Sequence, residues 1–98
     1  MRVPKELKIR YLQRRTQEIP ELICSIDNGD FGFAERVGHQ LKGNAVTFEI
    51  PQIAYIGLEM ESAAQKKDLD KLRVLIQKLQ TSLDSVRAHW LGDDFKNE

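Results

Sequence analysis

The stretch LDKLRVLIQKLQTSLDSV, residues 69 to 86, decides the fold class of this 98-residue chain. Its apolar side chains recur every three or four residues, which places them on one face of an α-helix. They form a long heptad-like seam made of Leu69, Leu72, Leu75, Ile76, Leu79, Leu83 and Val86. Asp68 precedes the seam and is a suitable N-terminal cap. We therefore predict a helix over about residues 69–90.

Three further helical regions precede this seam, over about residues 4–28, 31–49 and 51–66. The first carries a stripe of Leu12, Ile19, Leu22, Ile23 and Ile26, and the third a stripe of Ile53, Ile56, Met60 and Ala63. Pro20 lies inside the first region and predicts a kink or a division into two helices. Gly29 and Asp30 are suited to end that region and to cap the next. Pro51 fits the first turn of the third helix, and the residue before it should leave helical geometry.

The pattern predicts an all-α fold, because no alternating strands flank a two-residue turn anywhere in the sequence. Amphipathic helices joined by short connections favour an antiparallel four-helix bundle, here with an additional short or kinked N-terminal helix. We expect a single domain over residues 1–98, with a core over about 5–90. The polar tail, residues 91–98, is expected to fray.

The overall composition argues against several classes of function. The chain has 15 basic and 15 acidic side chains, so it lacks the basic excess expected of a protein that binds nucleic acid or an anionic membrane. No signal peptide and no membrane span are apparent. The one cysteine, Cys24, lies among apolar residues and is interpreted as a core filler. These features predict a cytoplasmic domain.

The second helix contains an unusual stretch, GHQLKGNAVTF, residues 38 to 48. At about 100° per residue, its core face consists of Val37, Leu41, Asn44, Ala45 and Phe48. His39 falls roughly 170° from the centre of that face and should point to water. Lys42 and Gly43, at i+3 and i+4, are its neighbours on the helix surface, and Val46 continues the same face.

Gly43 is the informative residue of this surface, because a glycine inside a helix costs about 1 kcal/mol relative to alanine. Access to the imidazole would compensate, since a bulky partner can approach where no side chain stands. Lys42 supplies a flexible point charge suited to a phosphoryl group, and Val46 an apolar docking contact. The alternative is an ordinary surface histidine beside an ordinary lysine.

The pentapeptide from His39 to Gly43 reads H-x-L-K-G and closely resembles the signature of histidine-containing phosphotransfer (HPt) domains. Other segments are similar to the family in the same order along the chain. They are the break at Gly29-Asp30, Arg36-Val37-Gly38 before the histidine, Thr47-Phe48 at the helix end, Ile56-Gly57 with Met60-Glu61 and Ala63-Ala64, and Asp68. The resemblance spans about residues 5 to 90. The chain departs from the family pattern at Asn44, where a small residue is usual, and at Glu49 and Lys67, where glycine is usual.

The resemblance implies a four-helix bundle with one exposed histidine that accepts a phosphoryl group from a receiver-domain aspartate and relays it to another receiver. Carried over, His39 is the phosphoacceptor, Lys42 stabilises the phosphoryl group and Gly43 leaves room for the partner. The expected partner-binding surface consists of Glu35, Arg36, Gln40 and Val46. The implied partners are response-regulator receiver domains in two-component signal transduction, with a hybrid histidine kinase as a further candidate.

The sequence offers little catalytic machinery of its own. It has no glycine-rich nucleotide loop, no Walker lysine and no acidic metal cluster, so we expect neither ATP-dependent kinase activity nor a cofactor or bound metal. The partner then supplies Mg²⁺ and the reacting aspartate, and the protein is a monomeric shuttle rather than a stand-alone enzyme. Two alternatives remain: a helical adaptor that binds a receiver or kinase domain without transfer, and a metal- or ligand-binding bundle. Glu61, Gly57, His89 and Trp90 are interpreted as structural.

Overall fold

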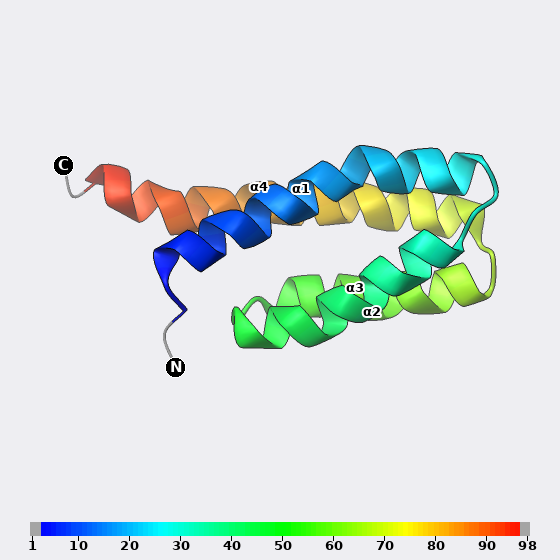
Figure 1. The fold of residues 1–98 in the computed structure, drawn as a ribbon, viewed down its shortest axis with the longest axis horizontal. Coiled ribbons are helices and arrows are strands. Elements are labelled where there is room, and N and C mark those ends of the chain that lie inside the picture. The colour runs from blue at the N-terminus through cyan, green and yellow to red at the C-terminus, as the bar shows by residue number, and fades with distance from the viewer. Residues whose placement is uncertain (1–2, 97–98) are drawn as a thin grey trace.

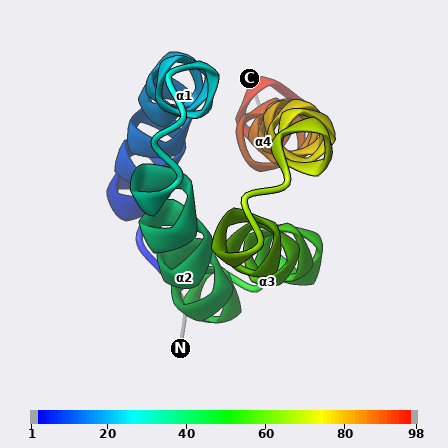
Figure 2. The same cartoon turned by 90° about the vertical axis from the view of Figure 1, so that its right-hand side faces the viewer.

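The computed structural model describes the backbone of residues 3–96 and the side chains of residues 3–90. This part of the chain forms four helices and no strand: α1 (Lys5–Asp27), α2 (Gly32–Thr47), α3 (Pro51–Gln65) and α4 (Leu69–Lys96). Each helix runs back along the one before it, so α1 begins and α4 ends at the same end of the molecule (Figure 1). Viewed end-on, the helices follow one another in chain order around the core (Figure 2). The predicted all-α class is confirmed.

The connections between the helices are short because each preceding helix ends in the same hydrogen-bonded motif. After α1, α2 and α3 a residue with positive φ is followed by a backbone N–H that donates to a carbonyl five residues back. These bonds join Asp30 to Ser25 at 2.9 Å, Ile50 to Ala45 at 3.0 Å and Asp68 to Ala63 at 2.9 Å. Each turn therefore satisfies carbonyls that the helix end would otherwise leave without a partner.

The residues with positive φ in these turns are Gly29 (φ 79°), Glu49 (φ 58°) and Lys67 (φ 55°). Gly29 is the predicted left-handed cap. Glu49 and Lys67 are the two positions at which glycine is usual in the family that the sequence resembles, and they adopt the left-handed conformation despite their side chains. The turn geometry is therefore retained at some cost in backbone strain.

Of the two acidic caps predicted from the sequence, Asp68 directly precedes α4, whereas Asp30 lies one residue before Phe31, the N-cap of α2. The Asp30 carboxylate accepts a hydrogen bond from the Gly32 N–H at 3.1 Å, and the Asp68 carboxylate accepts one from the Lys71 N–H at 3.1 Å. Both satisfy backbone donors in the first turn of a helix. Pro51 is the first residue of α3, as predicted.

The core lies between the four apolar stripes. The seam of α4 is buried as predicted, except that Leu69 is only partly covered. The closest pair of helices is α2 and α3, whereas α1 touches α2 only thinly. At one end of the molecule Phe48 packs on Tyr11, with ring centroids 4.2 Å apart, and on Trp90 at 6.0 Å. This aromatic cluster joins α1, α4 and the turn after α2.

The helix boundaries correct two predictions. Pro20 neither divides α1 nor separates a short additional helix, because α1 is continuous from Lys5 to Asp27. Pro20 and Thr16, whose carbonyl loses its partner, both lie on the exposed face, where water can hydrate the free carbonyl. The predicted end of the fourth helix at about residue 90 is also too early, since α4 continues to Lys96. Residues 97–98 lie outside the described part.

Three predicted core residues are exposed instead. Apart from Tyr11, the buried positions of α1 follow a spacing of three and four residues: Leu12, Arg15, Ile19, Leu22 and Ile26. Ile23 and Cys24 fall outside this stripe and face solvent. Asn44 was placed on the core side of α2, yet it is exposed, because the thin contact between α1 and α2 leaves that flank open.

Candidate functional site

His39 lies in the middle of α2, on the face directed away from the core, and its side chain is 68% exposed. The neighbouring Gly38 is buried against α3. A Cβ at Gly38 would lie 2.7 Å from the Gly57 carbonyl oxygen and from the Glu61 backbone nitrogen. A Cβ at Gly57 would lie 2.7 Å from the Gly38 carbonyl oxygen. The two glycines therefore let the backbones of α2 and α3 touch, which brings the side chain of Glu61 beside His39.

Glu61 joins the histidine and the lysine of the motif. Its Oε2 lies 2.7 Å from His39 Nδ1, and its Oε1 accepts a hydrogen bond from Lys42 Nζ at 3.1 Å. The carboxylate side chain is 18% exposed. The hydrogen bond from Lys42, and then that from His39, lower the pKa of the Glu61 carboxyl below its usual range. Glu61 is thus a carboxylate at neutral pH and can only accept.

This carboxylate determines the tautomer of His39. Because Glu61 can only accept, Nδ1 must carry the hydrogen and donate it. In the neutral ring Nε2 then holds a lone pair, and within residues 3–90 no side chain or backbone group bonds to it. An exposed imidazole with a free Nε2 can act as a nucleophile toward an electrophile brought by a partner.

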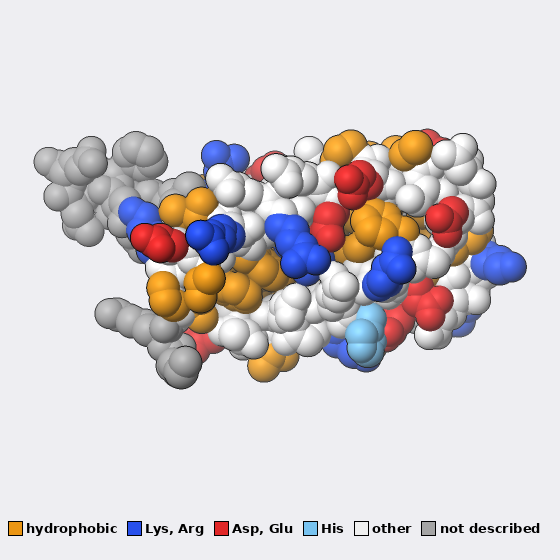
Figure 3. Space-filling view, in the orientation of Figure 1, with side chains coloured by type: hydrophobic (Ala, Val, Ile, Leu, Met, Phe, Trp, Pro, Cys, Tyr) orange, Lys and Arg blue, Asp and Glu red, His pale blue; other side chains and the backbone are white. Residues whose placement is uncertain are grey.

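The other residues on this face leave it accessible. A Cβ at Gly43 would meet no atom within 4 Å, so the surface beside His39 is open. Val46 is 72% exposed, as predicted. Lys42 is partly exposed and keeps its ammonium on Glu61. On the face seen in Figure 3, basic and acidic side chains are interspersed rather than gathered into a patch of one sign.

A shallow hollow of about 560 Å³ lies beside His39 and contains three of the four residues expected to form the partner-binding surface. It is lined by Gly32, Glu35, Arg36, His39, Gln40 and Glu61. The Arg36 guanidinium stacks over the Phe33 ring at 5.7 Å, which holds it one turn before His39. Val46, the fourth residue, lies outside this hollow on the same face of α2.

Two residues near the site were missed or underrated at the sequence level. Glu61 was interpreted as structural from the sequence, yet its carboxylate contacts both His39 and Lys42. The signal was the pair of glycines, 38 and 57, which allow the close approach. Arg15 was not singled out at all, although it occupies an apolar position of the α1 stripe. A charged residue at such a position indicates a buried polar contact.

Two further types of site find no support in the described residues. No group of three or more histidine, cysteine or acidic side chains among them is placed to hold a metal ion. None of the helices within that range is both long enough and apolar enough to span a membrane.

The geometry agrees with a comparison against known protein families. The Hpt domain matches residues 7–89, most of the chain. No curated protein and no solved structure matches this chain. The chain therefore belongs to the Hpt domain family, whose members carry out histidine phosphotransfer in phosphorelays together with receiver domains.

Proposed function

We propose that His39 accepts a phosphoryl group from the aspartyl phosphate of a receiver domain and passes it to the aspartate of another receiver. The observation that carries this proposal is the exposed imidazole whose Nδ1 is held 2.7 Å from the Glu61 carboxylate. That contact leaves Nε2, which bonds to no group among the described residues, as the nucleophilic atom. The proposed scaffold is an antiparallel four-helix bundle that acts as a monomer.

The transfer step follows from this arrangement. The Nε2 lone pair attacks the phosphorus, a P–N bond forms, and the P–O bond to the receiver aspartate breaks. The aspartate leaves as a carboxylate with the bonding electron pair. The ring becomes positively charged as Nε2 is phosphorylated, and the adjacent Glu61 carboxylate stabilises that charge. The reverse sequence returns the phosphoryl group to a second receiver.

Lys42 and Gly43 have separate roles in the proposal. The Lys42 ammonium shares the Glu61 carboxylate with His39, so it lies close to the incoming phosphoryl oxygens and can reach them as a flexible point charge. Gly43 leaves the surface open where the receiver must approach. Positioning and charge neutralisation are the main requirements of phosphoryl transfer.

The partner supplies the remaining chemistry. We propose that Mg²⁺ and the reacting aspartate belong to the receiver domain, and that no nucleotide binds to this chain. A hybrid histidine kinase is a further candidate partner, since its own receiver would present the same aspartyl phosphate.

The test is transfer from a purified, phosphorylated receiver to this protein, with His39→Gln and His89→Gln as variants. We expect acid-labile, base-stable label on the parent chain and on His89→Gln, and none on His39→Gln. Label on His39→Gln would refute the assignment. A receiver that binds the parent chain yet transfers no label would favour the adaptor function instead.

A further inference from the structure

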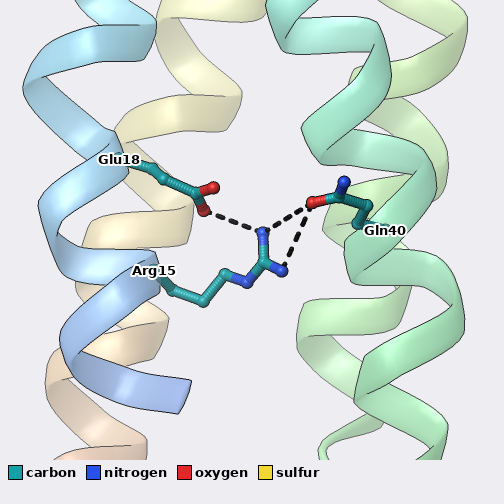
Figure 4. A network of polar contacts seen from close by, with 3 residues as sticks. All are labelled: Arg15, Glu18 and Gln40. Carbon is teal, nitrogen blue, oxygen red and sulfur yellow. Dashed lines mark hydrogen bonds and ion pairs between the residues drawn. The ribbon is translucent and has the colours of Figure 1, made fainter. Parts of the chain in front are cut away.

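Arg15 is a charged side chain buried inside the described part of the molecule, with 2% of its surface exposed. It reaches from α1 to α2 (Figure 4). Its Nη1 bonds Glu18 Oε1 at 2.8 Å, and both Nη1 and Nη2 donate to Gln40 Oε1 at 3.4 Å. Its guanidinium carbon lies 5.4 Å from the Tyr11 ring centroid. A buried cation with such specific partners requires an explanation, because removing a charge from water is costly.

Arg15 fixes the orientation of the Gln40 amide. A guanidinium has donors only, so the carbonyl oxygen of Gln40 must face it and the NH₂ group must point away. Figure 4 shows the amide nitrogen directed away from Arg15. The oxygen is occupied by two donors, while no acceptor for the NH₂ group occurs among the described residues. Gln40 therefore presents two oriented N–H donors.

These donors lie on the open side of the phosphoacceptor. Gln40 follows His39 and lines the same hollow. At about 100° per residue it lies on the α1 side of His39, whereas Lys42 lies on the α3 side, where Glu61 holds it. Gly43 falls between His39 and Gln40 on this projection. A partner seated over Gly43 is thus flanked by the imidazole and by the Gln40 amide.

We propose that the Gln40 NH₂ group donates a hydrogen bond to an oxygen acceptor on the docked receiver domain, and that Arg15 is the positioning residue that aims it. This inference rests on the proposed function. The occupant is the receiver rather than the phosphoryl group, because Lys42 addresses the phosphoryl side of the imidazole. The buried cation thereby links the α1 scaffold to partner recognition.

The first experiment uses Gln40→Glu, which keeps oxygen atoms toward Arg15 and removes the NH₂ donors. Gln80→Glu, at an exposed position on α4, is the matched control for the added charge. With a phosphorylated receiver as donor, we expect Gln40→Glu to raise KM about threefold to tenfold, the worth of one hydrogen bond, with kcat within about twofold. The lifetime of the isolated phosphorylated protein should stay unchanged.

The second experiment is a double-variant cycle with Arg15→Met. Arg15→Met alone should raise KM because the Gln40 amide is free to turn, and combining it with Gln40→Glu should add no further increase. Circular dichroism at the assay temperature confirms that the variants are folded. A raised KM in a folded Arg15→Met variant indicates that Arg15 positions the Gln40 amide, whereas a variant that is only less stable would keep its KM.

Three outcomes would overturn the inference. They are an unchanged KM in Gln40→Glu, fully additive effects in the cycle, and a lower kcat with an altered phosphohistidine lifetime, which would assign the contact to the phosphoryl group. Each presupposes transfer to the parent protein. Failure of the parent chain to accept label from any receiver would refute the proposed function itself.

Discussion

Two glycines of α2, five residues apart, have opposite surroundings. Gly38 is pressed against the backbone of α3, and Gly43 faces open space. Both are unfavourable to a helix by propensity, so each must be retained for another reason. For Gly38 the reason lies inside the fold. For Gly43 no such reason is found among the described residues, which is consistent with a requirement that arises only in the complex.

The two positions should therefore respond differently to alanine. We expect Gly43→Ala to raise the free energy of unfolding by about 1 kcal/mol through helix propensity, and to slow phosphoryl transfer because a methyl group enters the docking surface. Gly38→Ala should lower the free energy of unfolding by about 1–3 kcal/mol, since the added carbon collides with backbone atoms. Urea unfolding and the transfer assay measure both effects. Normal transfer kinetics in Gly43→Ala would contradict the access role.

Replacing the Glu61 carboxylate tests its control of the His39 tautomer. In Glu61→Gln the amide can turn either its oxygen or its NH₂ group toward His39. Nδ1 can then accept a hydrogen bond as well as donate one, so it no longer has to carry the hydrogen. We expect transfer to slow on the order of tenfold. Heteronuclear NMR of the imidazole nitrogens should report a mixture of tautomers, while an unchanged Nδ1–H form would argue against the role.

The same substitution has a consequence for acid stability. The pKa of Glu61 is lowered in the folded protein, so its contribution to stability is present above the ordinary carboxyl pKa of about 4.3 and is lost as the pH falls through the lowered value. Glu61→Gln should therefore flatten the dependence of stability on pH below about pH 4. Unfolding curves at several acid pH values measure this slope.

At the scale of the elements, the turns after α2 and α3 contain backbone strain that glycine would relieve. Glu49 and Lys67 occupy left-handed backbone positions that favour glycine. We expect Glu49→Gly and Lys67→Gly each to raise the free energy of unfolding by about 0.5–1 kcal/mol. Gly29→Ala, at φ 79°, is the opposite control and should destabilise. Chemical denaturation measures all three, and a loss of stability in both glycine variants would exclude strain at these turns.

The positions of the helices were largely predictable from the sequence, whereas the residues that each helix buries or exposes were less predictable. Caps and turns depend on local chemistry, which is why Asp30, Asp68 and Gly29 were identified correctly. The exposure of Asn44 depends on how closely a neighbouring helix approaches. The apolar periodicity of a single helix does not predict that distance. The contact between Glu61 and His39 likewise requires two helices to touch. His39 itself was placed correctly because its face is far from any core position.

At the scale of the whole molecule, the aromatic cluster closes the end where α1 begins and α4 ends. Tyr11 contributes its ring to Phe48 there, and its buried hydroxyl has no hydrogen-bond partner within the described residues. An unsatisfied buried hydroxyl costs roughly 1–3 kcal/mol. The cluster thus joins the helices at the expense of one poorly accommodated polar group.

We expect Tyr11→Phe to raise the free energy of unfolding by about 1 kcal/mol near neutral pH. Burial raises the pKa of Tyr11, with Arg15 opposing it. The folded protein therefore keeps its full stability below the ordinary tyrosine pKa of about 10. It loses stability as the pH rises toward the raised pKa of the folded state, because Tyr11 ionises more readily in the unfolded chain. The phenylalanine variant should lack this alkaline loss. Thermal unfolding between neutral and alkaline pH tests both points, and a destabilised variant would indicate that the hydroxyl has a partner.

The backbone contact at Gly38 and Gly57 bears on how a signal passes through this protein. Shape changes in proteins use interfaces whose side chains have two discrete packings. At this crossing the two backbones meet directly, so there is no intervening layer to rearrange. We expect phosphorylation to change the charge at His39 while α2 and α3 keep their relative position. The partner would then recognise the phosphohistidine itself, and the protein would carry the signal without adopting a second conformation.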